Sequence, residues 1–147
     1  MKKFQLLFLI SIVILVVSCG WKAKNESNLT TKDLQFIRDL GILDSNETIL
    51  LFETNGGFSG LKQSGNFVTD KRVASYWIEN NLKELNFAFY SQIDSMKLNN
   101  KTNALTLASS ITIFANYKKT FDLYIDADSS RLNQFYDKTL EIWKKNK

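Results

Sequence analysis

Histidine and proline are absent from the chain, and cysteine occurs once among its 147 residues. Without histidine, the chain lacks the side chain that most often acts as a general base near neutral pH, and the commonest zinc ligand. Catalysis by a Ser-His-Asp or a Cys-His arrangement is therefore excluded. The single cysteine, Cys19, can form no disulfide within the chain, and the absence of proline excludes a proline-rich linker.

A strong excess of charge of one sign is also missing. The chain has 19 basic and 15 acidic residues. Lys2 and Lys3 belong to the N-terminal leader described below, and without them 17 basic residues face 15 acidic ones, a net charge of +2. Such a nearly neutral domain offers no broad positive surface, so we expect no nucleic-acid partner.

The N-terminus carries the one long apolar run of the sequence. Met1-Lys2-Lys3 is a short basic start, and residues 4–17 follow with only Gln5 and Ser11 polar. This run of 14 residues is shorter than the roughly 20 that a membrane-spanning helix needs. A basic start, a short apolar stretch and a small residue before the cut predict a secretory signal peptide over residues 1–18. An uncleaved membrane anchor is the alternative.

The end of this run, Val16-Val17-Ser18-Cys19, resembles the lipobox of bacterial lipoproteins. The resemblance implies transfer of diacylglycerol to the Cys19 thiol, cleavage between Ser18 and Cys19, and N-acylation of Cys19. Membrane lipid would then be a partner through the acylated cysteine, since each buried acyl CH₂ contributes about 0.8 kcal/mol. Gly20 stands where an aspartate would resemble an inner-membrane retention signal, which favours the periplasmic side of the outer membrane in a Gram-negative cell.

The remaining sequence predicts a flexible tether over residues 19–30 and a single domain over residues 31–147. Thr31 as N-cap, Asp33 in the first turn and Gly41 at the C′ position predict a short helix over 31–40. Asp128 or Ser129 can cap a second helix over about 129–145. Its apolar stripe follows the helical period and consists of Leu132, Phe135, Tyr136, Thr139, Leu140 and Trp143.

Between these helices, over about 48–126, the sequence predicts six or seven strands. The aromatic content of 13% favours a β-rich fold. The candidate segments are 48–53, 66–69, 72–78, 86–90, 93–98, 105–113 and 121–125, with 61–68 the unclear one. Their short spacing leaves no room for helical crossovers, so we expect an α+β fold that is mainly antiparallel, with a terminal helix covering an open sheet or barrel.

Three segments resemble bacterial pleckstrin-homology-like (PH-like) domains. "GNFVTDKRVASYW" is similar to their strand-turn-strand signature, "FAFYSQIDSMKL" to the segment after it, and "GILDSNETILLF" to the lead-in to the first strand. Together with the terminal helix, the resemblance covers residues 42–145 and implies a seven-stranded bent barrel capped by that helix. Phosphoinositide-binding relatives carry several basic residues in the first hairpin loop, whereas residues 54–66 hold only Lys62, so we expect no phosphoinositide ligand.

Two groups of residues are candidate binding sites. Lys71 and Arg72 could contact an acidic ligand, although Asp70-Lys71-Arg72 more simply forms a hairpin turn in which Asp70 binds local backbone amides. Tyr76 and Trp77 belong to an aromatic-rich middle of the chain that could line a groove; such residues more often fill a core. The other members are Phe87, Phe89, Tyr90, Phe114 and Tyr117.

We expect no metal site, no cofactor and no catalytic residue. Asp122, Asp126 and Asp128, with Glu53, could be a carboxylate pair or a cation site, but calcium needs six or more oxygens and acid-base pairs need convergence. Asp122 and Asp126 share one strand face and are expected to face solvent. The chain is therefore predicted to be a membrane-anchored binding or scaffold module for an envelope protein or peptide. A lipid- or amphiphile-binding module is the alternative, and a small α+β hydrolase or isomerase a remote one.

Overall fold

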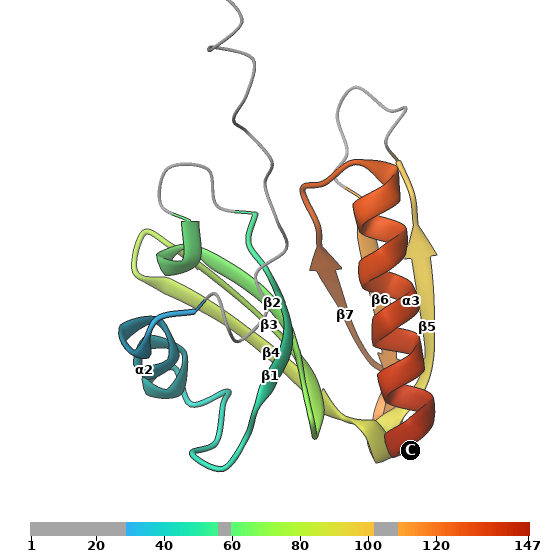
Figure 1. The fold of residues 1–147 in the computed structure, drawn as a ribbon, viewed down its shortest axis with the longest axis horizontal. Helices are drawn as coiled ribbons and strands as arrows, with labels where there is room; N and C mark the ends of the chain where they lie inside the picture. The colour runs from blue at the N-terminus through green and yellow to red at the C-terminus, as the bar shows by residue number, and fades with distance from the viewer. Residues whose placement is uncertain (1–28, 56–59, 102–108) are drawn as a thin grey trace, which may run out of the picture.

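The computed structural model describes residues 29–55, 60–101 and 109–147 and has an α+β fold with two antiparallel sheets (Figure 1). The signal peptide, Ser18, Cys19 and most of the tether lie outside these residues. The first sheet has the order β1-β2-β3-β4 and the second the order β5-β6-β7. The elements are α2 (Thr31–Asp39), β1 (Ile49–Glu53), β2 (Ser64–Thr69), β3 (Arg72–Glu79), β4 (Leu82–Phe89), β5 (Ile93–Asn99), β6 (Ser110–Ala115), β7 (Lys119–Tyr124) and α3 (Ser129–Asn146).

The seven strands and the terminal helix confirm the expected fold class, with open sheets rather than a closed barrel in the part of the chain that the structure describes. All strand pairs within the sheets are antiparallel. Within the same residues, neither helix combines the length and the apolar character needed to cross a membrane.

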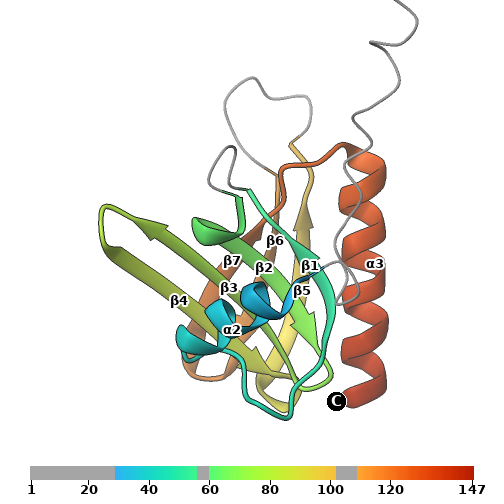
Figure 2. The same cartoon turned by 60° about the vertical axis from the view of Figure 1, so that its left-hand side comes forward.

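The two faces of the first sheet are covered by different elements, as Figures 1 and 2 show. Ile37 of α2 packs on one face, against Phe67 of β2. Val68, the next residue of β2, points to the opposite face and joins the core shared with the second sheet and α3. Every residue of β2 is buried, because both faces of this strand are covered.

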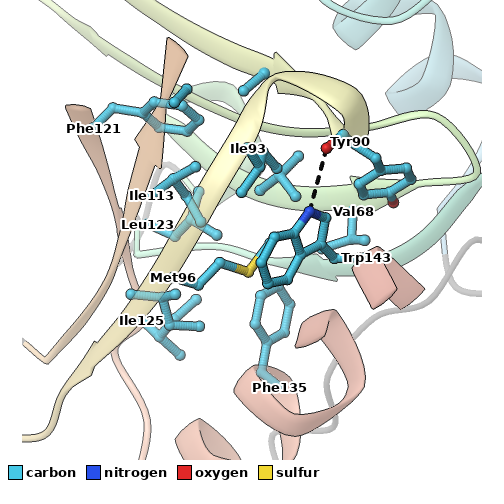
Figure 3. Packing of buried hydrophobic residues seen from close by; sticks show 14 of the residues in the cluster. Val68, Tyr90, Ile93, Met96, Ile113, Phe121, Leu123, Ile125, Phe135 and Trp143 are labelled. Atoms are coloured by element: carbon cyan, nitrogen blue, oxygen red, sulfur yellow. Dashed lines mark hydrogen bonds between the residues drawn. The ribbon is translucent and has the colours of Figure 1, made fainter. Parts of the chain in front are cut away.

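Helix α3 lies on the inner face of the second sheet and closes the open side of the molecule. Phe135 and Trp143 belong to its predicted stripe and pack with Ile113 and Leu123 of the sheet (Figure 3). The indole Nε1 of Trp143 donates a hydrogen bond of 3.2 Å to the carbonyl oxygen of Tyr90. The space between α3 and the sheets is thus filled by core side chains in the described part of the chain.

The predicted N-cap is confirmed for α3 and wrong for α2. Asp128 caps α3 by accepting a hydrogen bond from Arg131 N, as predicted. Helix α2 is capped by Thr30 and not by Thr31, because Thr30 and Asp33 form a reciprocal capping box. Gly41 has φ +77°, the left-handed conformation expected at the C′ position.

Strand β4 begins four residues earlier than predicted, at Leu82 instead of Asn86. The reason is the two-residue turn Asn80-Asn81, in which both residues have positive φ, 50° and 66°. This backbone matches the twist of a hairpin, and asparagine tolerates it better than most residues. The hairpin places the polar residues of β4 opposite those of β3, which forms part of the site described next.

Candidate functional site

A pocket of about 490 Å³ lies between the first sheet and β7, the strand of the second sheet that contacts β3. Its walls are formed by β2, β3 and β4 on one side and by β7 on the other. The lining residues are mostly polar and include no lysine or arginine: Asn55, Ser64, Asn66, Ser75, Tyr76, Trp77, Glu84, Asn86, Asp122, Tyr124 and Asp126.

The first wall arises from a change of polarity along one sheet face. Cross-strand partners on the same face form successive rows, and the row Val68, Val73 and Ala88 packs into the core. One step further along the strands, the same face presents Asn66, Ser75 and Asn86. The next row is Ser64, Trp77 and Glu84. Polar side chains cannot be buried in an apolar core without cost, so the second sheet covers only the apolar end of this face.

The second wall follows from strict alternation along β7 and the two residues after it. Phe121, Leu123 and Ile125 are buried in the core, whereas Asp122, Tyr124 and Asp126 line the pocket. The alternation was predicted, but these side chains face a pocket rather than open solvent. Alternation alone cannot distinguish the two, because both are polar surroundings.

Asp122 and Tyr124 are held in place along the β7 wall. Asp122 accepts a hydrogen bond of 2.5 Å from Thr112 Oγ1 and a longer one of 3.4 Å from the Tyr124 hydroxyl. Burial, and then the negative charges of Asp122 and Glu84, raise the pKa of Tyr124. Tyr124 is therefore a neutral phenol at physiological pH, and the field of Glu84 extends from the first wall to the second.

Two hydrogen bonds tie the walls together at the edge of the pocket. Asn66 Nδ2 donates to the carbonyl oxygen of Tyr124 over 2.6 Å, and Asp126 N donates to Asn55 Oδ1 over 3.0 Å. Asn55 is itself positioned by Ser64, whose Oγ accepts from Asn55 N over 2.9 Å. The pocket is thus a preformed feature whose width is set by the contacts between the two sheets.

Two side-chain oxygens of the pocket form no hydrogen bond in the part of the chain that the structure describes. Ser75 is only 7% exposed, and no hydrogen bond is formed by its Oγ. Asn66 is similarly buried, and its Oδ1 is unpaired although its Nδ2 is used. Both oxygens are reached from the pocket, because Arg38 Nε is the one fully buried side-chain nitrogen or oxygen without a partner among the described residues. They can therefore accept hydrogen bonds from a molecule that enters the pocket.

The four residues predicted as ligand contacts are divided between two places. Trp77 and Tyr76 line the pocket, although the Tyr76 hydroxyl donates to Leu61 O over 2.5 Å and its ring packs over Gly65. Lys71 and Arg72 lie at the other end of β3, away from the pocket residues.

Arg72 is occupied by a buried network of ion pairs. Its guanidinium contacts Glu47 at 2.8 Å and Asp44 at 2.5 Å, and it lies over the ring of Phe89. Lys71 Nζ donates to Asn46 Oδ1 over 2.8 Å. The arrangement matches the interpretation of this segment as a structural hairpin.

Asp70 has a different role from the predicted one. Its Oδ1 accepts a hydrogen bond from Thr48 N, at the start of β1, instead of from amides of its own turn. The turn amides of Lys71 and Arg72 are satisfied by Thr69 Oγ1, at 3.0 and 2.9 Å. Asp70 therefore links the β2–β3 turn to β1.

Most of the predicted aromatic groove is core or surface instead. Tyr90 is buried, and its hydroxyl donates to Thr69 O. Phe114 is exposed on β6, and Phe87 packs against the core under α2. Ser75, Glu84 and Asn86 line the pocket but were not predicted as site residues. The signal that could have found them is the polar side chains at the alternate positions of adjacent strands that face inward.

Comparison of the chain with protein-family models, with curated proteins and with solved structures finds no match. The described residues contain no group of three or more acidic, cysteine or histidine side chains placed to hold a metal ion. By its own geometry, the pocket is a preformed, polar, acidic site with two accessible aromatic rings, those of Trp77 and Tyr124.

Proposed function

We propose that the chain is a membrane-anchored bacterial lipoprotein whose single domain is a binding module for an envelope protein or peptide. Cys19 is the anchor, and the domain has no catalytic role and needs no cofactor. The observation that supports binding is the pocket between the sheets, in which Ser75 Oγ and Asn66 Oδ1 form no hydrogen bond within the described part of the chain.

A pocket between the ends of two sheets suits a peptide for a second reason. β4 and β7 are the last strands of their sheets, and both contribute to the walls. Edge strands have outward N–H and C=O groups that can bind an extended partner chain. A peptide can therefore bind along an edge while one side chain enters the pocket.

The anchor is tested by replacing Cys19 with serine in the full chain. The wild-type protein should incorporate an alkyne-labelled fatty acid in cells and sediment with membranes. The Cys19→Ser variant should incorporate none, because serine lacks the thiol that accepts the lipid. Equal labelling of both proteins would refute the lipoprotein assignment without bearing on the pocket.

Binding is tested with a photo-reactive side chain in place of Tyr124, in the full chain expressed in its native envelope. Tyr124 lines the pocket and is 47% exposed, so the probe can reach an occupant. We expect a discrete protein or peptide adduct, identified by mass spectrometry. The adduct should disappear when Trp77→Ala is added.

The control probe stands at Lys138, on the exposed surface of α3. The same adduct at both positions, or none at position 124, would refute recognition through the pocket.

A further inference from the structure

We propose that the pocket receives the positively charged side chain of a lysine or arginine from its peptide partner. This inference rests on the proposed function, because it names the group that the same pocket recognises. Three carboxylates line the pocket: Glu84 of β4, Asp122 of β7, and Asp126, which follows β7. No lysine or arginine is among the lining residues. The local charge is thus opposite in sign to the net charge of the whole chain, which is +4.

Among the residues that the structure describes, none forms an ion pair with these carboxylates. Glu84 Oε1 accepts from Asn86 Nδ2 over 3.1 Å, and Asp122 accepts from two hydroxyl groups. These partners are uncharged, so they orient the carboxylates and leave their negative charge in place. An incoming cation is attracted from both walls at once.

The aromatic side chains of the pocket suit the same kind of ligand. Trp77 and Tyr124 keep 37% and 47% of their surface exposed, one on each wall. An ammonium or guanidinium group over such a ring gains cation–π attraction, and the aliphatic part of the side chain packs on the ring edges. The uncharged state of Tyr124, whose pKa is raised, preserves its hydroxyl as a donor toward Asp122.

Two acceptors that open onto the pocket complete the match. Ser75 Oγ and Asn66 Oδ1 are unpaired in the described chain and belong to adjacent positions of one cross-strand row. Lysine brings three N–H donors and arginine five, and neither side chain brings an acceptor. A basic side chain therefore satisfies acceptors that the protein leaves open.

Two other ligand classes fit the pocket less well. The phosphate of a lipid headgroup would face three carboxylates, and like charges repel. A neutral sugar could use the amide groups and Trp77, but it would leave the charge of the pocket uncompensated. The edge strands β4 and β7 on either side add backbone groups that only a peptide uses fully.

The test uses the full chain in detergent micelles and follows the ¹⁵N–¹H signal of the Trp77 indole by NMR. The probes are the capped tripeptides acetyl-Gly-Lys-Gly-amide and acetyl-Gly-Arg-Gly-amide. The norleucine tripeptide is the neutral isostere, and cellobiose is the neutral sugar. Trp77→Phe identifies the signal among the three tryptophans. We expect at least one basic tripeptide to shift it saturably at millimolar concentration, and norleucine and cellobiose to leave it unmoved.

The decisive variant is Glu84→Gln combined with Asp126→Asn, which removes two charges without changing shape. Both residues are exposed and take no part in ion pairs within the described residues, so folding is preserved. Its matched control is Asp137→Asn with Glu141→Gln, which removes two charges from the exposed face of α3. We expect the pocket variant to weaken binding of the basic tripeptide about tenfold, and the control to change it less than about twofold.

Three results would overturn the inference: no saturable shift with either basic tripeptide, equal binding of the norleucine isostere or cellobiose, or equal loss in the pocket variant and the α3 control. Failure here remains distinguishable from failure of the proposed function. The cross-linking at position 124 reports a pocket-bound partner whatever the charge of the group that enters.

Discussion

Removing the charge of Glu47 is expected to destabilise the domain strongly, because Glu47 is the buried partner of a buried arginine. None of the Glu47 side-chain surface and only 4% of that of Arg72 is exposed. Breaking such a pair on one side costs about 3–5 kcal/mol, because the remaining charge stays buried without compensation. Asp44 also contacts Arg72, but its side chain is 59% exposed and water screens its charge. We therefore expect Glu47→Gln to lower the free energy of unfolding by about 3 kcal/mol.

Urea unfolding followed by circular dichroism measures this change as a lower midpoint with an unchanged m-value. Glu141→Gln, an exposed control on α3, should change stability by less than about 0.5 kcal/mol. The double variant Glu47→Leu/Arg72→Met removes both charges. We expect its loss of unfolding free energy to be clearly smaller than the sum of the losses in the single variants Glu47→Leu and Arg72→Met, because no unpaired charge remains. A loss below about 1 kcal/mol for Glu47→Gln, or full additivity in the double variant, would refute the account of this network.

Three further predictions concern the packing of the core. Gly65→Ala should destabilise the domain by about 1–3 kcal/mol in urea unfolding, because the new Cβ would lie 2.4 Å from Tyr76 Cε1; a loss of the same size in a Tyr76→Leu background would contradict this cause. Trp143→Phe should cost about 1 kcal/mol or more through the lost hydrogen bond to Tyr90 O; thermal unfolding measures it, and an unchanged midpoint would contradict it. Burial raises the pKa of Tyr76 and of Tyr90 above 10.0. The free energy of unfolding should therefore be constant below about pH 10 and fall as the pH rises further, because the unfolded chain loses these phenol protons first. Urea unfolding measured at increasing alkaline pH checks this, and a constant free energy of unfolding would contradict it.

The two amphipathic patterns near the C-terminus could be predicted because each depends on neighbours in the chain. Phe121, Leu123 and Ile125 alternate in a strand, and Leu132, Phe135 and Trp143 follow the helical period. The structure buries all six. Local periodicity decides which face of an element is apolar, and hydrophobic burial then decides where that face points.

The predicted start of β4 and the predicted N-cap of α2 were wrong, because each depends on local geometry that more than one residue can satisfy. Thr30 and Thr31 are both acceptable N-caps, and only the reciprocal bond with Asp33 selects Thr30. Asn80-Asn81 is a recognisable hairpin signal in retrospect, since both residues adopt positive φ. The first residues of β4 after this turn are mostly polar, so an apolar pattern does not indicate where the strand begins.

The pocket could not be predicted from the chain as a linear pattern. Ser75, Asn86 and Tyr124 lie on separate strands, and their meeting depends on strand register and on how the second sheet covers the first. Asp70 illustrates the same dependence, since its partner Thr48 is 22 residues away. Short-range periodicity thus sets the class of fold, the helices and the apolar faces. The place and the acidic character of the site depend on how the two sheets pack together. Their packing stops where polar side chains would have to be buried.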